Sequence, residues 1–256
     1  MFICIAGKNQ CSIDVIKILA KHKINKKNIF ILPNSTDKGR DTWQPSLKKY
    51  ALKNKFKIVK LDELYEIKDL IFFSLEYEKI INVNKFESKS LFNYHFSLLP
   101  KYRGCHTNFL QIFNGEKYTG VTLHKINKGI DTGNIIDKKK FKIMLNDTAY
   151  DNYIKLMNCS VKLFKKNLYK IMKSSYKEKK QILSKGSYYK RSSVDYKKII
   201  KINTRKQTLR IHNKIRSLIF PPYQMPIVNG IQVKKSIYRK DKIYLIESST
   251  NRYKNR

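Results

Sequence analysis

The first half of the chain alternates between short apolar runs and segments whose apolar residues recur with a helical period. A short apolar run bounded by turn residues predicts a buried strand, and the longer period predicts an amphipathic helix. The predicted strands are Phe2–Ala6, Ile29–Leu32, Phe56–Leu61 and Leu70–Leu75, and the predicted helices start at Ser12 and Ser46. Strands separated by helices favour a mostly parallel sheet with helices on both faces.

The pattern changes at Leu91, where polar residues are interleaved in a fifth predicted strand, Leu91–Leu99. A short helix is predicted over Thr107–Phe113, because Asn114 and Gly115 follow it as stop signals. Two further strands are predicted after this helix, at Tyr118–Ile126 and Asn134–Ile143, with a glycine-flanked turn at residues 129–133 between them.

A long helix is the clearest element of the second half. Apolar residues recur with the helical period from Tyr150 to Ile171, and Asp147 and Thr148 precede them as capping residues. The segment from Ser174 to Arg191 is basic, serine-rich and aperiodic, so a connecting loop is expected. A helix at Arg205–Phe220 and strand-like residues 223–256 complete the chain. We therefore predict an α/β domain at 1–190 and a small C-terminal helix and β-hairpin extension at 191–256.

Composition narrows the class of protein. Of 256 residues, 41% are hydrophobic, which excludes a wholly disordered chain. No apolar run approaches the ~20 residues that span a bilayer, and the start lacks a basic leader, so a cytoplasmic protein is expected. The cysteines Cys4, Cys11, Cys105 and Cys159 contain no Cys-x-x-Cys pair. Free thiols are therefore expected, without zinc or a disulfide framework.

The formal net charge of +36 has two explanations. It favours an anionic partner such as nucleic acid, a membrane surface or a charged substrate. However, only nine of the 55 basic residues are arginine and alanine occurs four times, as the codon usage of an AT-rich genome would produce. Surfaces that read nucleic acid depend more on arginine, whose guanidinium pairs with phosphates and bases. The composition favours the codon-usage explanation, and we expect neither nucleic acid nor a membrane as a partner.

The predicted fifth strand contains the first candidate functional residues. Side chains alternate between the faces of a strand, so Asn93, His95 and Ser97 share one face. Consecutive polar groups on a core strand are costly unless they are used. At the carboxyl end of a parallel sheet they would face the ligand crevice. A structural role for His95 is the alternative.

Two glycine-containing loops are further candidates. After the first strand only Gly7 appears, without the Gly-x-Gly-x-x-Gly pattern of dinucleotide sites. Lys8 and Asn9 follow it at the start of a helix, where they either meet an anionic ligand or form a simple turn. In the second loop, glycines flank Asp131 and allow it to approach another group. A carboxylate beside an imidazole and an amide can serve proton transfer and oxyanion stabilisation.

Three linked motifs carry a definite resemblance. They are N-x-H-x-S-L-L-P-x-x-R-G from Asn93, T-G-V-T-x-H at 119–124, and G-I-D-T-G from Gly129. This arrangement resembles the signature of the folate-dependent formyltransferases, and the order of elements fits that family from residue 1 to about 145. The resemblance implies a Rossmann-like formyltransferase fold, 10-formyltetrahydrofolate as formyl donor, no metal, and Asn93, His95 and Asp131 as the catalytic residues.

The mechanism implied by the resemblance is acyl transfer to an uncharged amine. Asn93 would stabilise the oxyanion, with help from His95 once it is protonated. Asp131 would tune His95 and help to pass the amine proton to the leaving folate nitrogen. The sequence does not identify the group that takes the first proton, and we choose His95 as the base.

The resemblance also implies two sets of ligand contacts. The donor set is Ser74, Tyr77, Ile81, Leu98, Gly129, Ile130 and Asp131. The acceptor set is Lys8, Asn9, Arg40, Trp43, Gln44, Leu75, Glu76, Tyr77, Arg103, Gly104 and Tyr223. Trp43 is the only tryptophan, and an ordinary loop anchor is the alternative for it.

Within the family, the sugar N-formyltransferase branch fits best. Residues 41–46 resemble a segment of that branch near the nucleotide, and Ile215–Tyr223 resembles its post-core element. The branch implies a dTDP-linked amino sugar as acceptor, dTDP-4-amino-4,6-dideoxyglucose or its 3-amino counterpart. It also implies a role in lipopolysaccharide O-antigen synthesis and a homodimer. The alternatives are a methionyl-tRNA formyltransferase-like enzyme and a non-enzymatic basic RNA-binding protein.

Overall fold

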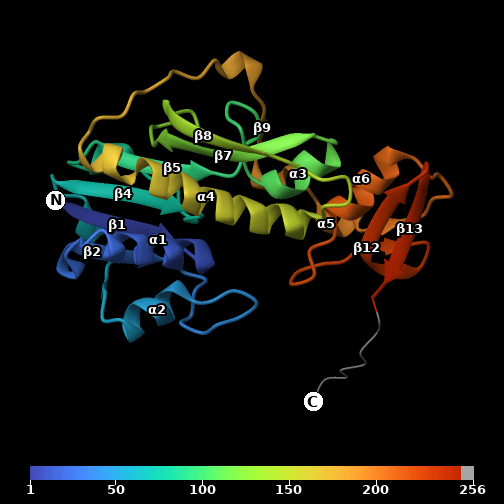
Figure 1. The fold of residues 1–256 in the computed structure, drawn as a ribbon, viewed down its shortest axis with the longest axis horizontal. Coiled ribbons are helices and arrows are strands. Elements are labelled where there is room, and N and C mark those ends of the chain that lie inside the picture. Colours follow the sequence, from blue (N-terminus) through green and yellow to red (C-terminus); the bar gives the residue numbers. More distant parts are fainter. Residues whose placement is uncertain (249–256) are drawn as a thin grey trace. The chain divides into compact units, whose positions relative to one another are not determined.

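The structure is a computed structural model that describes residues 1–248 (Figure 1). Its chain forms two compact units, neither of which is continuous in sequence. The first unit contains Met1–Gly104, Gly120–Lys140 and Leu156–Tyr188. The second contains Cys105–Thr119, Phe141–Lys155 and the described residues from Tyr189 onward. The boundary expected after residue 190 thus falls close to Tyr189, where the last segment of the second unit begins. Two earlier segments of the chain also belong to the second unit.

A seven-stranded sheet organises the first unit, with the order β3-β2-β1-β4-β5-β7-β8. The strands β1 to β5 are parallel to their neighbours and β7 runs antiparallel to β5. Their bounds are β1 Phe2–Gly7, β2 Ile29–Pro33, β3 Lys57–Ile58, β4 Leu70–Leu75, β5 Ser90–His95, β7 Tyr118–Lys125 and β8 Ile135–Lys142. The mostly parallel α/β sheet predicted from the sequence is confirmed.

Long helices pack on one face of this sheet. Helix α4, Ala149–Met172, places Phe164 against Phe73 and Tyr94. Helix α1, Asn9–Lys21, lies beside it through a Cys11–Ser160 contact, and helix α2 is Leu47–Lys53. The opposite face carries a buried cluster that includes Leu32, Phe72 and Phe86. This second face is covered by single 3-10 turns, Asp62–Leu64 and Val83–Lys85, and by loops, so the expected helical layer there is short.

Helix ends follow local capping chemistry. The Ser46 hydroxyl accepts from the Lys49 amide at 2.9 Å, as predicted for the start of α2. Thr148 caps α4 because its hydroxyl accepts from the Asp151 amide, and the Asp151 carboxylate accepts from the Thr148 amide in return. Ser12 is not the cap of α1, which begins at Asn9, and its hydroxyl instead donates to the Lys8 carbonyl.

The second unit is built around a smaller sheet and short helices. The sheet order is β10-β11-β12-β13, and the long pair β12/β13 is an antiparallel hairpin. The strands are β10 Lys201–Ile202, β11 Ile227–Val228, β12 Ile231–Arg239 and β13 Lys242–Glu247; the helices are α3 Thr107–Phe113, α5 Tyr196–Ile199 and α6 Leu209–Ser217. Helix α6 is shorter than the predicted Arg205–Phe220, because Thr208 caps it at the Ile211 amide.

Two further observations complete the fold. A two-stranded sheet pairs β6, Arg103–Gly104, with β9, Tyr188–Tyr189. Strand β9 lies inside the segment from Ser174 to Arg191 that was expected to be a plain loop. Among the described residues, no helix combines the length and the apolar character that a membrane crossing requires.

Candidate active site

The carboxyl end of β5 supplies the first two functional side chains. Strand alternation directs Phe92 and Tyr94 into the core, where both rings pack near Phe73. Asn93 and His95 therefore share the other face. The strand ends at His95, earlier than predicted, because the chain turns with the Ser97 amide donating to the His95 carbonyl. Ser97 is fully buried and its hydroxyl donates to the Lys101 carbonyl at 2.7 Å, which makes it a structural residue of this turn.

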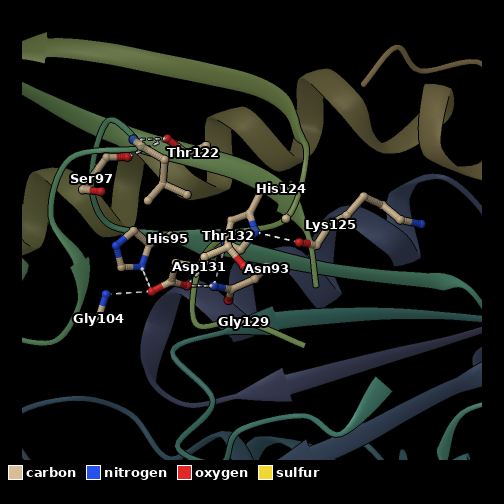
Figure 2. Close-up of polar contacts among 12 residues, drawn as sticks. Asn93, His95, Ser97, Gly104, Thr122, His124, Lys125, Gly129, Asp131 and Thr132 are labelled. Atoms are coloured by element: carbon tan, nitrogen blue, oxygen red, sulfur yellow. Dashed lines mark hydrogen bonds and ion pairs between the residues drawn. The ribbon is translucent and has the colours of Figure 1, made fainter. Parts of the chain in front are cut away.

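Asp131 is the centre of the polar cluster, as Figure 2 shows. Its backbone lies in the left-handed region, with φ 53°, between two glycines. One carboxylate oxygen accepts from Asn93 Nδ2 at 3.2 Å, and the other accepts from the Gly104 amide at 2.8 Å. The second oxygen also lies 3.4 Å from His95 Nδ1. The structure thus brings together all three residues that the resemblance implied as catalytic.

Electrostatics keep this carboxylate charged. Burial by itself raises the pKa of the Asp131 carboxyl, since it disfavours the charged form. The neighbouring His95 and His124 rings and the Gly104 amide outweigh that cost and hold the pKa well below its ordinary value. Asp131 is therefore a fixed anion rather than a proton donor.

His95 lies between two acceptors. Its Nε2 is 2.7 Å from the Tyr102 carbonyl oxygen, and its Nδ1 faces the Asp131 carboxylate. A carbonyl only accepts, so Nε2 carries a proton and Nδ1 is the nitrogen that can gain or lose one. A proton taken up at Nδ1 would be stabilised by Asp131.

His124 is a fourth member of the cluster, and the sequence analysis assigned it no role. It is the cross-strand partner of Asn93 on β7, and its Nε2 lies 3.1 Å from Asn93 Nδ2. Its Nδ1 is 2.8 Å from the Lys125 carbonyl oxygen, so Nδ1 carries a proton. Its Nε2 also lies 3.5 Å from an Asp131 carboxylate oxygen, so Nε2 accepts from Asn93 in the neutral ring and faces Asp131 in the protonated ring. The motif at 119–124 contained this histidine, but only the strand pairing shows its partner.

The strap, residues 179–187, holds the loops around His95 and Asp131. Gln181 Nε2 donates to the carbonyls of Asp131 at 2.9 Å and Gly133 at 2.7 Å. Ser187 Oγ accepts from the Tyr102 amide at 2.9 Å, which fixes the residue whose carbonyl meets His95. The aperiodic, basic sequence of this segment gave no sign of these contacts.

The expected donor contacts lie mostly on the same face of the sheet. Ser74 pairs in register with Asn93, and Tyr77 packs edge-on against Phe72 with the ring centroids 6.4 Å apart. Ile81 is buried in the cluster beneath this face, whereas Leu98 is partly exposed and Ile130 is exposed. Gly129 is also exposed, at the start of the Asp131 turn.

The expected acceptor contacts in the first unit form a partly connected group. Asn9 Nδ2 lies 3.4 Å from a Glu76 carboxylate oxygen, and Lys8 precedes α1. Gln44 is buried and accepts from the Gln10 amide at 3.3 Å. Trp43 is partly buried, Arg40 is exposed, and Leu75 is fully buried, so Leu75 can reach a ligand only through its backbone.

Three other acceptor residues have distinct environments. The Gly104 amide already donates to Asp131. Arg103 Nε is buried and makes no hydrogen bond with any described residue, which leaves a guanidinium donor available. Tyr223 belongs to the second unit, where it is 71% exposed and stacks on Phe220. Across residues 1–248, no cluster of three or more His, Cys, Asp or Glu side chains could hold a metal ion.

The comparisons with known proteins identify the family. The family model described as "Formyl transferase" matches residues 1–168, so the chain belongs to the formyl transferase family. It is an N-formyltransferase, and the family resemblance noted in the sequence is confirmed.

Two solved structures resemble the chain closely. WlaRD, "a sugar 3N-formyl transferase" solved with dTDP and 5-N-formyl-THF, has 47% identity and a TM-score of 0.87, with 93% of this chain and 86% of that chain covered. An N-formyltransferase from Helicobacter canadensis, in complex with folinic acid and dTDP-3-aminofucose, has 44% identity and a TM-score of 0.87, with 93% and 88% covered.

Curated relatives include enzymes with different acceptors. The bifunctional polymyxin resistance protein ArnA of Wigglesworthia glossinidia brevipalpis is 36% identical over 187 residues, which are 69% of this chain but 28% of that protein. The methionyl-tRNA formyltransferase of Clostridium tetani is 28% identical over 247 residues, 91% of this chain and 78% of that protein. Family membership alone therefore does not select the acceptor.

Proposed function

We propose that the protein transfers the formyl group of 10-formyltetrahydrofolate to an amino group of a dTDP-linked amino-dideoxy sugar. The observation that carries this proposal is the His95–Asp131–Asn93 cluster in a chain with 44–47% identity to two enzymes whose structures contain formylated folates and dTDP ligands. The sequence analysis named the 4-amino sugar first. One similar enzyme is a sugar 3N-formyl transferase and the other is bound to dTDP-3-aminofucose, which favours the 3-amino counterpart.

In the proposed mechanism, His95 moves the proton. As the uncharged amine adds to the formyl carbon, Nδ1 of His95 takes the amine proton and shares it with the Asp131 carboxylate 3.4 Å away. His95 then returns the proton to the leaving folate nitrogen as the bond from that nitrogen to the formyl carbon breaks. The low pKa of Asp131 keeps the carboxylate charged and so stabilises the imidazolium between the two transfers.

Asn93 has a constrained role in this scheme. An amide nitrogen has two N–H bonds, and in the described state both are directed at protein acceptors, Asp131 and His124. For Asn93 to donate to the developing oxyanion, one of these contacts must be exchanged for the substrate oxygen. The oxyanion would then be stabilised by Asn93 and by the protonated His95.

We also propose the wider setting implied by the sugar branch. The formylated sugar would serve lipopolysaccharide O-antigen synthesis, the enzyme would act in the cytoplasm, and the chain would form a homodimer. These parts of the proposal rest on the resemblance to the sugar N-formyltransferases.

A methionyl-tRNA formyltransferase activity is the second candidate. It is favoured by the match of 91% of the chain to the Clostridium tetani enzyme and by the net charge of +36, which suits a nucleic-acid substrate. The identity of 28% is well below that to the sugar enzymes.

The test measures folate product formation with three acceptors, the 3-amino dTDP sugar, the 4-amino dTDP sugar and charged methionyl-tRNA, and with a buffer blank. Wild type is compared with His95→Asn, and His22→Asn at an exposed position serves as the matched control. We expect turnover with a dTDP sugar, a loss of about 10²-fold or more in kcat for His95→Asn, and an unchanged control. Turnover with methionyl-tRNA but with neither dTDP sugar would favour the methionyl-tRNA formyltransferase activity instead.

A further inference from the structure

The strap carries an exposed apolar tip, which we define as Ile182 and Leu183. These neighbouring side chains are 57% and 41% exposed, at the start of the single 3-10 turn Leu183–Lys185. Figure 1 shows this part of the chain as a gold segment with one short turn, between α4 and β9. Aliphatic side chains that lie together in water, rather than singly, mark an interaction surface.

Two anchors hold the tip in its exposed position. Before the tip, Gln181 is buried and its Nε2 donates to two carbonyls of the loop at 131–133. After the tip, the Ser187 amide donates to the Pro100 carbonyl at 3.3 Å. Gly186 also packs so closely on Pro100 that a Cβ would lie 2.2 Å from the same oxygen. Because the chain is fixed on both sides of the tip, binding through the tip costs little additional ordering.

Lysine side chains flank the tip on both sides. Lys177, Lys179 and Lys180 precede it, Lys185 follows it, and all four are exposed. None of the four forms an ion pair with any residue that the structure describes. Their ammonium groups are therefore available to an anionic partner that also contacts the tip.

The local charge exceeds the background set by the composition. From 174 to 191 the sequence has six basic residues and one acidic residue, a formal charge of +5. This charge per residue is about twice that of the whole chain, which carries +36 over 256 residues. The one acidic residue, Glu178, already accepts from Asn134 Nδ2 at 2.9 Å. The segment is thus a basic patch that surrounds an apolar point.

This combination fits the surface of an anionic membrane. Lysine ammonium groups are attracted to the negative headgroups, and aliphatic side chains beside them can enter the boundary with the acyl chains. A surface for single-stranded nucleic acid would instead combine arginine with aromatic rings on which bases stack. The strap contains neither arginine nor an aromatic residue.

We propose that the strap docks the protein on an anionic lipid surface, with the tip at the acyl boundary and the lysines at the headgroups. Because Gln181 also holds the Asp131 loop, docking would bring the catalytic cluster close to the membrane. Residue counts gave no reason to expect a membrane partner, since they do not show where apolar and basic side chains gather. The docking goes beyond the proposed reaction and does not depend on its acceptor.

The test measures binding of the full chain to vesicles by co-sedimentation, without substrates. Vesicles of phosphatidylglycerol and phosphatidylethanolamine are compared with neutral phosphatidylcholine vesicles. Since a net charge of +36 attracts any anionic surface, matched controls must separate the strap from the rest of the molecule. The charge variant carries Lys179→Gln, Lys180→Gln and Lys185→Gln. Its control carries three substitutions of exposed lysines elsewhere, Lys21→Gln, Lys53→Gln and Lys68→Gln.

A second pair of variants tests the apolar contact. The tip variant carries Ile182→Ser and Leu183→Ser, and its control carries Leu52→Ser and Ile80→Ser, which are 60% and 76% exposed. All four substituted side chains are exposed, so we expect every variant to fold, as thermal unfolding would show.

We expect wild type to bind the anionic vesicles and not the neutral ones. The charge variant should bind about 10²-fold more weakly, the loss expected for three lysines near an anionic surface. The tip variant should bind about tenfold more weakly, because it loses aliphatic area at the acyl boundary. Both controls should stay within about threefold of wild type, since their positions lie outside the docked segment. Amide hydrogen exchange at residues 181–187 should slow when wild type binds vesicles.

Four results would overturn the proposal. Wild type that does not bind anionic vesicles would remove the lipid partner. Equal losses in the charge variant and its control would mean that binding is spread over the whole surface. A tip variant that binds like wild type would show that no apolar side chain enters the bilayer. A charge variant that keeps vesicle binding but loses affinity for single-stranded RNA would assign the patch to nucleic acid.

Discussion

At the scale of single residues, the members of the site share a small number of hydrogen-bond donors and acceptors. Asp131 accepts from Asn93 and from the Gly104 amide, and it faces His95 as well. Asn93 in turn divides its two N–H bonds between Asp131 and His124. A change at any one position therefore redirects the hydrogen bonds of the others.

His124 is expected to act as a positioning residue. Replacing it by phenylalanine keeps the ring but removes the acceptor for Asn93, so the amide loses its orientation. We expect kcat to fall by up to about 10²-fold, with KM for the acceptor changed little, because geometry rather than binding is lost. Steady-state kinetics measure this split, and His124→Gln, which retains an acceptor, should recover part of the loss. A rise in KM alone would contradict the role.

Asp131 should also couple stability to pH. Its folded-state pKa lies below the ordinary value, so the charged carboxylate stabilises the fold above about pH 4, and the stabilisation is lost as pH falls toward the folded value. Asp131→Asn is expected to lower the free energy of unfolding at pH 7 by about 1–3 kcal/mol. Urea unfolding at several pH values measures the effect. The gap between wild type and variant should shrink between about pH 5 and pH 2, and a constant gap would contradict the coupling.

At the scale of elements, β5 presents two of the proposed catalytic side chains while separate loops orient them. The strand supplies Asn93 and His95 on one face, and its antiparallel neighbour β7 supplies His124. The strap then ties the Asp131 loop through Gln181 and the Tyr102 segment through Ser187. The Tyr102 and Asp131 segments, which both contact His95, are thus held by the same segment of chain.

Gln181 should therefore influence the reaction without contacting a substrate. In Gln181→Met the side chain keeps its length but loses both donors, which leaves the Asp131 and Gly133 carbonyls unpaired. We expect kcat to fall by about tenfold, the equivalent of about 1.4 kcal/mol. Faster amide hydrogen exchange in residues 129–133 should accompany the loss. The exposed Gln232→Met is the matched control, and normal kcat in Gln181→Met would show that the strap is only a connection.

At the scale of the whole molecule, the charge of +36 is the dominant property. We interpret it as mainly compositional, with a general attraction for anionic substrates as its consequence. Raising the ionic strength from about 0.01 to 0.1 M shortens the Debye length from about 30 to about 10 Å. We expect KM for the dTDP sugar to rise a few-fold while kcat stays constant, as steady-state kinetics in sodium chloride would show. Tight RNA binding that falls about 10³–10⁵-fold between 50 and 200 mM salt would contradict this interpretation.

The sequence by itself determined the central sheet and the choice of the proposed catalytic residues. Buried strands such as Leu70–Leu75 and capped helices such as α2 and α4 are encoded by local periodicity and capping, and the structure reproduces them. Asn93, His95 and Asp131 were found because strand alternation and a glycine-flanked turn are also local signals, which the family motifs reinforced.

Only the tertiary structure decided how those residues are held. The His124–Asn93 contact depends on the register between β5 and β7, and the contacts of Gln181 link residues far apart in an aperiodic segment. The division into two units, and the placement of 105–119 and 141–155 in the second, also follow from contacts between distant segments. Local patterns set which face a side chain occupies, whereas long-range pairing sets which partner it meets, and a single sequence encodes that pairing only through the packed fold.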